Sequence, residues 1–168
     1  MNTVTAPADA EQALAMVRAG LSYLAAADPA QMAVQVQAQC LHGLEQATAI
    51  GTVARTSILG AFTVGQGYID DGACSPRSWL IHQTRISKGA ATGHTAWVRR
   101  ARAHPRVLQA MASGELSESW ARTLCGWTDQ LPEDCRDTAD QILAGAAQGG
   151  MGLRVRWRRP CVGLDFAS

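Results

Sequence analysis

The residues with the clearest chemical potential lie between positions 75 and 114, where the chain carries seven basic side chains and no acidic one. Guanidinium and ammonium groups gathered on one surface neutralise the phosphates of nucleic acid. Side chains at the start of a recognition helix are placed to reach base edges. We therefore expect this basic segment to bind double-stranded DNA. Its candidate DNA-binding residues are Arg77, Arg85, Lys88, Thr92, Arg99, Arg100, Arg102 and Arg106.

The positive charge is local, because the formal net charge of the 168-residue chain is only +1. Residues 1–71 hold six acids against two bases, and residues 123–150 hold five acids against one. Opposed charges of this kind are also typical of an acidic flank packed on a basic face, or of solvated surfaces. Arginines at positions 99, 100 and 102 would in addition stabilise the carboxyl end of a helix. DNA binding, a solvated or intramolecular face, and a protein-binding surface therefore remain open alternatives.

The elements that position these residues are predicted to be helices. Apolar residues make up 47% of the chain, aromatic residues only 5%, and no run alternates with the period of a strand. The length suits about one domain. We predict an all-α fold with a disordered N-terminus over 1–7, a single helical domain over 8–150 and an irregular basic tail over 151–168.

Within the basic segment, capping signals divide the chain into short helices. Ser75 followed by proline opens a helix over 75–84, and Arg85 and Ile86 make a turn. Ser87 then caps a helix over 88–103, with Ala91, Thr95 and Val98 on its inner stripe. Further helices are predicted over 106–112, 117–128 and 132–147. Residues 75–130 therefore read as a helix-turn-helix-like region with two supporting helices.

Ahead of this region we predict a long helical hairpin formed by helices 8–27 and 29–62. The second helix is expected to pack its apolar stripe in the core, and it offers a surface for a homodimer as an alternative. Residues 65–72 read as a loop because of their glycine content. The predicted core stripe of helix 29–62 consists of Met32, Val36, Cys40, Leu44, Ala47, Ile50, Ala54, Ile58 and Ala61.

An ordered set of short motifs runs through the same region. It begins with Asp71-Gly72 and Ser75-Pro-Arg-Ser-Trp79-Leu80 and continues through Ser87-Lys88, Arg99-Arg100 and Pro105. It ends with Gly114-Glu115-Leu116-Ser117 and Ala121-Arg122. This pattern resembles the domain of unknown function 222 family of actinobacterial proteins, over roughly residues 8–150. The resemblance implies a helical region of the kind that precedes an HNH endonuclease domain in several members.

The order of basic helix, proline, short helix and Gly-x-Leu-Ser also looks like the DNA-binding core of partition proteins of the ParB type. This second likeness is one of fold and implies a helix that enters DNA. Two features depart from the family pattern. Trp120 stands where these families often place histidine. The tail over 152–168 does not continue the helical pattern, so the chain reads as a solo or truncated helical domain.

No catalytic, metal or cofactor motif is found. An HNH site needs a central asparagine, and Asn2 is the only asparagine in the chain. The phosphate-binding loop, the nucleophile elbow and the zinc-protease motif are all missing. We interpret the acids at positions 129, 133, 134, 137 and 140 as stabilising the start of the last helix. We therefore predict that the protein is not an enzyme and holds no metal or cofactor.

The remaining signals concern location. Five widely spaced cysteines form neither a zinc pattern nor a dense disulfide framework, which is typical of a reducing cytoplasm. No secretory signal opens the chain. The longest uncharged run with apolar character, residues 56–69, is too short and too rich in glycine to span a bilayer. The sequence predicts a cytoplasmic, non-catalytic DNA-binding or DNA-targeting module without its nuclease. The alternatives are a structural or oligomerisation domain and a truncated remnant.

Overall fold

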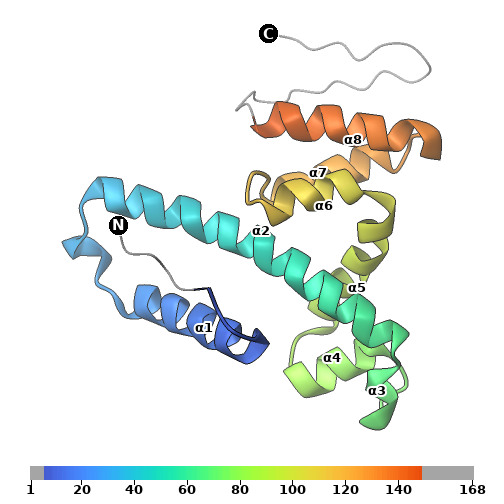
Figure 1. Ribbon diagram of the computed structural model, residues 1–168, viewed down its shortest axis with the longest axis horizontal. Helices are drawn as coiled ribbons and strands as arrows, with labels where there is room; N and C mark the ends of the chain where they lie inside the picture. The colour runs from blue at the N-terminus through green and yellow to red at the C-terminus, as the bar shows by residue number, and fades with distance from the viewer. Residues whose placement is uncertain (1–5, 149–168) are drawn as a thin grey trace. The chain divides into compact units, whose positions relative to one another are not determined.

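A computed structural model of the chain describes residues 6–148, and this range contains helices and no strand (Figure 1). The all-α prediction is therefore confirmed. Residues 1–5 of the predicted N-terminus and the whole predicted tail over 151–168 lie outside the described residues. The helices are α1 (Ala10–Ala26), η1 (Pro29–Gln31), α2 (Val34–Val64), α3 (Gly67–Asp70), α4 (Pro76–Thr84), α5 (Lys88–Ala103), α6 (Pro105–Ala112), α7 (Glu118–Thr128) and α8 (Glu133–Gln148).

The chain forms two compact units, 1–41 and 42–168, and the boundary falls within α2 rather than at an end of the predicted domain. The first unit holds α1, η1 and the start of α2. The Asp9 carboxylate caps α1 by accepting a 2.8 Å hydrogen bond from the backbone N–H of Gln12. None of residues 6–41 is buried. The predicted hairpin between α1 and the long helix therefore stays a prediction.

The long helix is shorter than expected at its amino end. Asp28 caps η1 through the backbone N–H of Ala30, but the chain is extended at Met32 before α2 begins. The Gln37 amide donates to the carbonyls of Pro29 and Met32, at 2.7 and 3.2 Å. The Gln37 side chain thus donates to carbonyls that would otherwise accept the hydrogen bonds of a continuous α-helix. The chain can therefore bend between η1 and α2.

The apolar stripe predicted for the core of this helix is wrong. Ile50 and Ile58 are 44% and 69% exposed, and the alanines at 47, 54 and 61 are exposed as well. The buried side chains of α2 are instead smaller or more polar. Small residues at a spacing of three and four allow close approach of a neighbouring helix, and hydroxyls can be satisfied within the helix. The buried residues are Ala49, Thr52, Thr56 and Leu59.

By length and composition α2 could also cross a membrane, since its most apolar window has a mean hydropathy of 1.2. This differs from the expectation that no segment is long enough. Core helices of globular proteins pass the same test, and Ala49 and Leu59 of α2 belong to the two apolar clusters of the second unit.

The segment predicted as a loop over 65–72 contains the one-turn helix α3. Gln66 takes a left-handed conformation ahead of it, with φ of 55°. The Phe62 ring packs against Tyr68 in α3, with ring centroids 6.5 Å apart. Aromatic packing therefore orders a stretch whose glycines favour a loop.

The main apolar cluster of the second unit joins α2, α5, α6, α7 and α8. Helix α8 packs against both α6 and α7 (Figure 1). Gly114 ends α6 with φ of 75°, a conformation that favours glycine, and the next helix starts with Ser117 as its cap. The cluster consists of Ala49, Trp97, Val107, Ala110, Met111, Leu116, Ala121, Leu124, Cys125, Leu143 and Ala144.

Candidate nucleic-acid interface

Two helices with strong local caps, α4 and α5, carry six of the eight candidate residues. Ser75 and Ser78 form a reciprocal capping box at the start of α4, with both backbone-to-hydroxyl distances 3.1 Å. The connection to α5 is three residues long, Arg85 to Ser87. Ser87 then caps α5 by accepting from the backbone N–H of Ala90 at 3.2 Å. The predicted helix boundaries in this region are correct within one residue at each end.

A second, smaller apolar cluster fixes α4 against α5 and the end of α2. Leu59, Leu80 and Ala91 are its buried members. Trp79 packs on the Phe62 ring with centroids 4.6 Å apart, and its indole N–H donates to the Asp71 carboxylate at 2.6 Å. Trp79 and Leu80 therefore face inward, and the start of α5 is held by packing.

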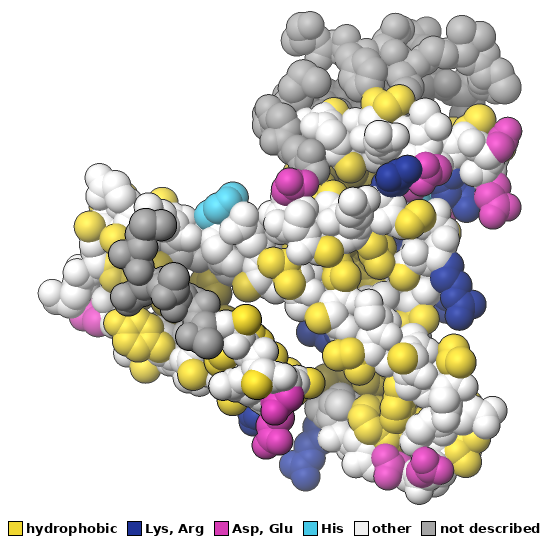
Figure 2. Space-filling view, in the orientation of Figure 1, with side chains coloured by type: hydrophobic (Ala, Val, Ile, Leu, Met, Phe, Trp, Pro, Cys, Tyr) yellow, Lys and Arg dark blue, Asp and Glu magenta, His cyan; other side chains and the backbone are white. Residues whose placement is uncertain are grey.

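The outer face of α5 carries basic residues near both of its ends. Lys88, Thr92, Arg99 and Arg102 recur at helical spacings of three, four and seven, and all four are exposed. Trp97 lies on the opposite face and is 1% exposed. In Figure 2 basic side chains project at the edge of the surface beside α5, and acidic and basic side chains lie together near the start of α8. The hydroxyl of Thr92 donates within the helix, to the carbonyl of Lys88.

The predicted residues fall into two groups. Arg85, Lys88, Thr92, Arg99 and Arg102 are exposed, and the four basic members of this set form no ion pair with any described residue. We call these five residues the α5 face.

The other three predicted residues are less available to a ligand. Arg106 pairs with Asp137 at 3.3 Å. Arg77 and Arg100 are half-buried. The Arg100 guanidinium lies over the Trp97 ring at 5.5 Å from its centroid, and its Nε is buried without a hydrogen-bond partner among the described residues.

A carboxylate that the sequence analysis missed anchors the middle of α5. Glu118 at the start of α7 accepts from the indole N–H of Trp97 at 3.1 Å and from the hydroxyl of Thr52 on α2 at 2.8 Å. It also pairs with Arg122 one turn later. Burial acts to raise the pKa of Glu118, but these hydrogen bonds outweigh it and lower the pKa below its ordinary value. Glu118 therefore stays ionised and ties three helices together.

His94 adds no charge to the interface at neutral pH. Burial lowers its pKa, and the nearby guanidinium of Arg55 lowers it further. The positive charge of this surface therefore comes from lysine and arginine alone.

A second buried polar cluster holds the end of α5. His104 is fully buried, and its Nδ1 and Nε2 lie 2.8 and 2.9 Å from the carboxylates of Asp140 and Asp129. The hydroxyl of Thr128 donates to the other oxygen of Asp140 at 2.6 Å. Burial opposes the charge of His104, but the hydrogen bonds and charges of the two aspartates raise its pKa above the ordinary value.

The role predicted for the acids around the last helix is therefore only partly right. Glu133 and Asp134 lie in the first turn of α8 as expected. Asp129 and Asp140 instead bind His104, and Asp137 pairs with Arg106.

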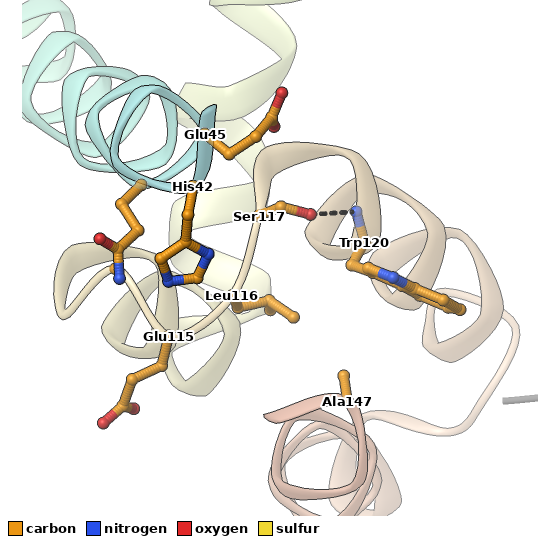
Figure 3. Close-up of a pocket in the computed structure, with 9 residues that line it drawn as sticks. His42, Glu45, Glu115, Leu116, Ser117, Trp120 and Ala147 are labelled. Atoms are coloured by element: carbon orange, nitrogen blue, oxygen red, sulfur yellow. Dashed lines mark hydrogen bonds between the residues drawn. The ribbon is translucent and has the colours of Figure 1, made fainter. Parts of the chain in front are cut away.

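The second unit also has a small pocket of about 190 Å³. In Figure 3 His42 and Glu45 reach it from α2, Glu115 to Ser117 from the connection before α7, and Ala147 from α8. Pockets for drug-sized ligands measure about 300–1,000 Å³, so this one is small for such a role. Among the described residues no three histidine, cysteine or acidic side chains are grouped to hold a metal ion. The α5 face is therefore the better candidate.

Comparison with protein-family models, curated proteins and solved structures finds no match for the chain. The resemblance to the domain of unknown function 222 family accordingly stays a hypothesis carried by the quoted motifs.

Proposed function

We propose that residues 75–130 form a non-catalytic DNA-binding module in which α4 and α5 act as a helix-turn-helix and the α5 face meets duplex DNA. The observation that carries the proposal is a set of exposed cations near both ends of one capped, tightly packed helix, with no acidic residue between positions 75 and 114. The set extends over about the length of α5, whose 16 residues span about 24 Å at 1.5 Å per residue. A helix of this size fits the major groove.

The number of cations sets how steeply the affinity for DNA should fall with salt. Arg85, Lys88, Arg99 and Arg102 supply four cations. If each neutralises one phosphate, the slope of log affinity against log salt is about −3.6. Affinity would then fall roughly a hundredfold between about 50 and 200 mM salt. Binding of this kind depends weakly on sequence, because phosphate contacts carry no direct sequence information.

Fluorescence anisotropy with labelled duplex DNA tests the proposal. The double variant Arg99→Ala/Arg102→Ala should weaken binding and reduce the salt slope by about two. Arg18→Ala removes an exposed arginine from α1 and serves as the control, with no expected change. Arg100 is left intact because its loss would disturb Trp97. Absence of any anisotropy change at low salt and micromolar protein would refute DNA binding.

Self-association through the long helix, predicted over 29–62, is a second candidate function, favoured by exposed apolar side chains of α2. Leu41 and Ile58 are 67% and 69% exposed, and Val34 is 72% exposed. Apolar surface of this extent commonly marks an interaction site. A homodimer through this helix predicts a mass near twice 17.8 kDa by light scattering, reduced to the monomer by Ile58→Glu. A monomeric wild-type protein at high micromolar concentration would exclude it.

A further inference from the structure

The first unit exposes apolar side chains and has no core of its own. None of residues 6–41 is buried, although helices of this length depend on packing for most of their stability in water. On α1, Leu14, Val17 and Leu21 recur at spacings of three and four and are 46% to 60% exposed. These spacings align side chains on one face of a helix.

The start of α2 carries a second apolar stripe. Val34 and Leu41 lie seven residues apart on its first turns, so they share a face, and both are exposed. The helix η1 and its flanking residues join α1 to α2, and both stripes belong to one compact unit. We call the five residues the first-unit stripes: Leu14, Val17, Leu21, Val34 and Leu41.

The same segment is almost without charge. Asp28 is the only aspartate, glutamate, lysine or arginine between positions 19 and 44, and its carboxylate caps η1. Exposed surfaces are normally rich in charged residues, whereas the centre of a protein–protein interface is depleted of them. Helices that lie on a lipid surface carry several lysines and arginines on their polar face, but Arg18 is the only basic residue of α1. Apolar exposure and missing charge therefore both favour a protein partner.

We infer that the first unit is a dimerisation element, in which the first-unit stripes pack against those of a second copy of the chain. This inference rests on the self-association candidate and deepens it, because it places the contact on α1 and the start of α2 instead of at Ile58. A second copy offers the same stripes, so one two-fold contact covers both and closes the assembly.

The exposed area agrees with a dimer. The first-unit stripes expose on the order of 500 Å² of side chain per copy. A standard interface buries about 800 Å² per partner, and about 65% of a homodimer interface is apolar. The apolar area that such an interface needs from each partner is therefore about the area that the stripes supply.

Sedimentation equilibrium of the full chain at high micromolar concentration tests the inference. Wild-type protein should have a mass near twice 17.8 kDa. The double variant Leu14→Glu/Leu21→Glu should have the monomer mass, because it brings carboxylates into an apolar contact. Its helix content by circular dichroism should equal that of wild type, since both side chains are exposed and glutamate favours helix.

Tyr23→Glu is the matched control. It adds the same charge to an exposed position of the same helix, but residues two positions apart point about 200° away from each other. Tyr23 therefore lies on the face opposite Leu21, and its variant should remain a dimer. Leu41→Glu should give the monomer from the second stripe, and it carries the test if the α1 variant loses its helix content.

The outcomes separate the inference from the self-association candidate. A monomeric wild-type protein overturns both, and its flotation with anionic lipid vesicles would assign the stripes to a membrane surface. A wild-type dimer that persists in Leu14→Glu/Leu21→Glu and in Leu41→Glu overturns the placement on the first unit. If Ile58→Glu then dissociates that dimer, self-association through the middle of α2 stands. Dissociation by Tyr23→Glu as complete as that by the stripe variants would also overturn the placement.

Discussion

Replacing His104 by phenylalanine is expected to destabilise the second unit by about 3–5 kcal/mol, the usual cost of removing one partner of a buried ion pair. Phenylalanine fills similar space, so little of the cost would come from a cavity. The fully buried carboxylate of Asp140 would keep only the hydroxyl of Thr128 as a described hydrogen-bond partner. For a chain of this size the loss corresponds to a fall in melting temperature of roughly 10 °C.

The assay is urea unfolding followed by circular dichroism. Asp137→Asn provides the control, because Asp137 forms an exposed pair with Arg106 whose loss costs at most about 1 kcal/mol. The double variant His104→Phe/Asp140→Leu should be more stable than the sum of the single losses predicts, since it leaves no buried carboxylate at position 140. A cost below about 1 kcal/mol for His104→Phe would refute the reasoning.

The same contacts predict a pH dependence with a definite sign. The pKa of His104 is raised above its ordinary value of 6.5. The stabilisation from its protonated form is therefore complete below that value and is lost as the pH rises through the folded-state pKa. The stability difference between wild type and His104→Phe should be largest near about pH 6 and should narrow at alkaline pH. A difference that grows with rising pH would contradict the assignment of a charged His104.

Two further predictions concern packing and thiol chemistry. Leu59→Ala should lower the free energy of unfolding in urea by about 2–5 kcal/mol, and Ile58→Ala by less than about 1 kcal/mol. The reason is that Leu59 is 5% exposed and Ile58 is 69% exposed. Equal losses would mean that the buried face of α2 is assigned wrongly. Burial raises the pKa of the Cys125 thiol to about 12, so iodoacetamide at about pH 8 should leave it unmodified while the exposed Cys74 and Cys135 react. Peptide mass spectrometry distinguishes the sites, and rapid labelling of Cys125 in the native protein would contradict its burial.

The helices that could be predicted from sequence are those with local boundary signals. Ser75, Ser87 and Ser117 each cap a helix within three residues of the donors they bind, and Pro105 begins α6. Such signals act over one turn, so a single sequence reveals them. The α5 face was predicted for the same reason, because its spacing on one helix can be read along the chain.

The polar clusters that hold this helix could not be predicted, because their partners are far apart in sequence. His104 reaches Asp129 and Asp140 across 25 and 36 residues, and Thr52 reaches Glu118 across 66. The buried face of α2 was missed for a related reason. Periodicity marks the most apolar stripe, whereas tertiary packing selected small residues and threonines that let Trp97 approach.

The contacts of the acidic residues bear on one explanation of the basic segment that its sequence leaves open, an acidic flank packed on the basic face. If the acidic flanks existed to cover the basic face, the acids would pair with it throughout. They pair instead with residues towards its carboxyl end. Asp129 and Asp140 contact His104, and Asp137 pairs with Arg106. Glu118 likewise accepts hydrogen bonds from Thr52 and Trp97 and pairs with Arg122.

Helix dipoles account for only part of the remaining cations. The dipole of α5 favours Arg102 in the last turn of α5 but opposes Lys88 in the first. Arg99 lies just before the last turn of α5, and Arg85 is the C-cap residue of α4, where the dipole of α4 favours a cation. Four cations thus remain exposed and without an ion pair to any described residue, and the proposed binding to duplex DNA would use all four.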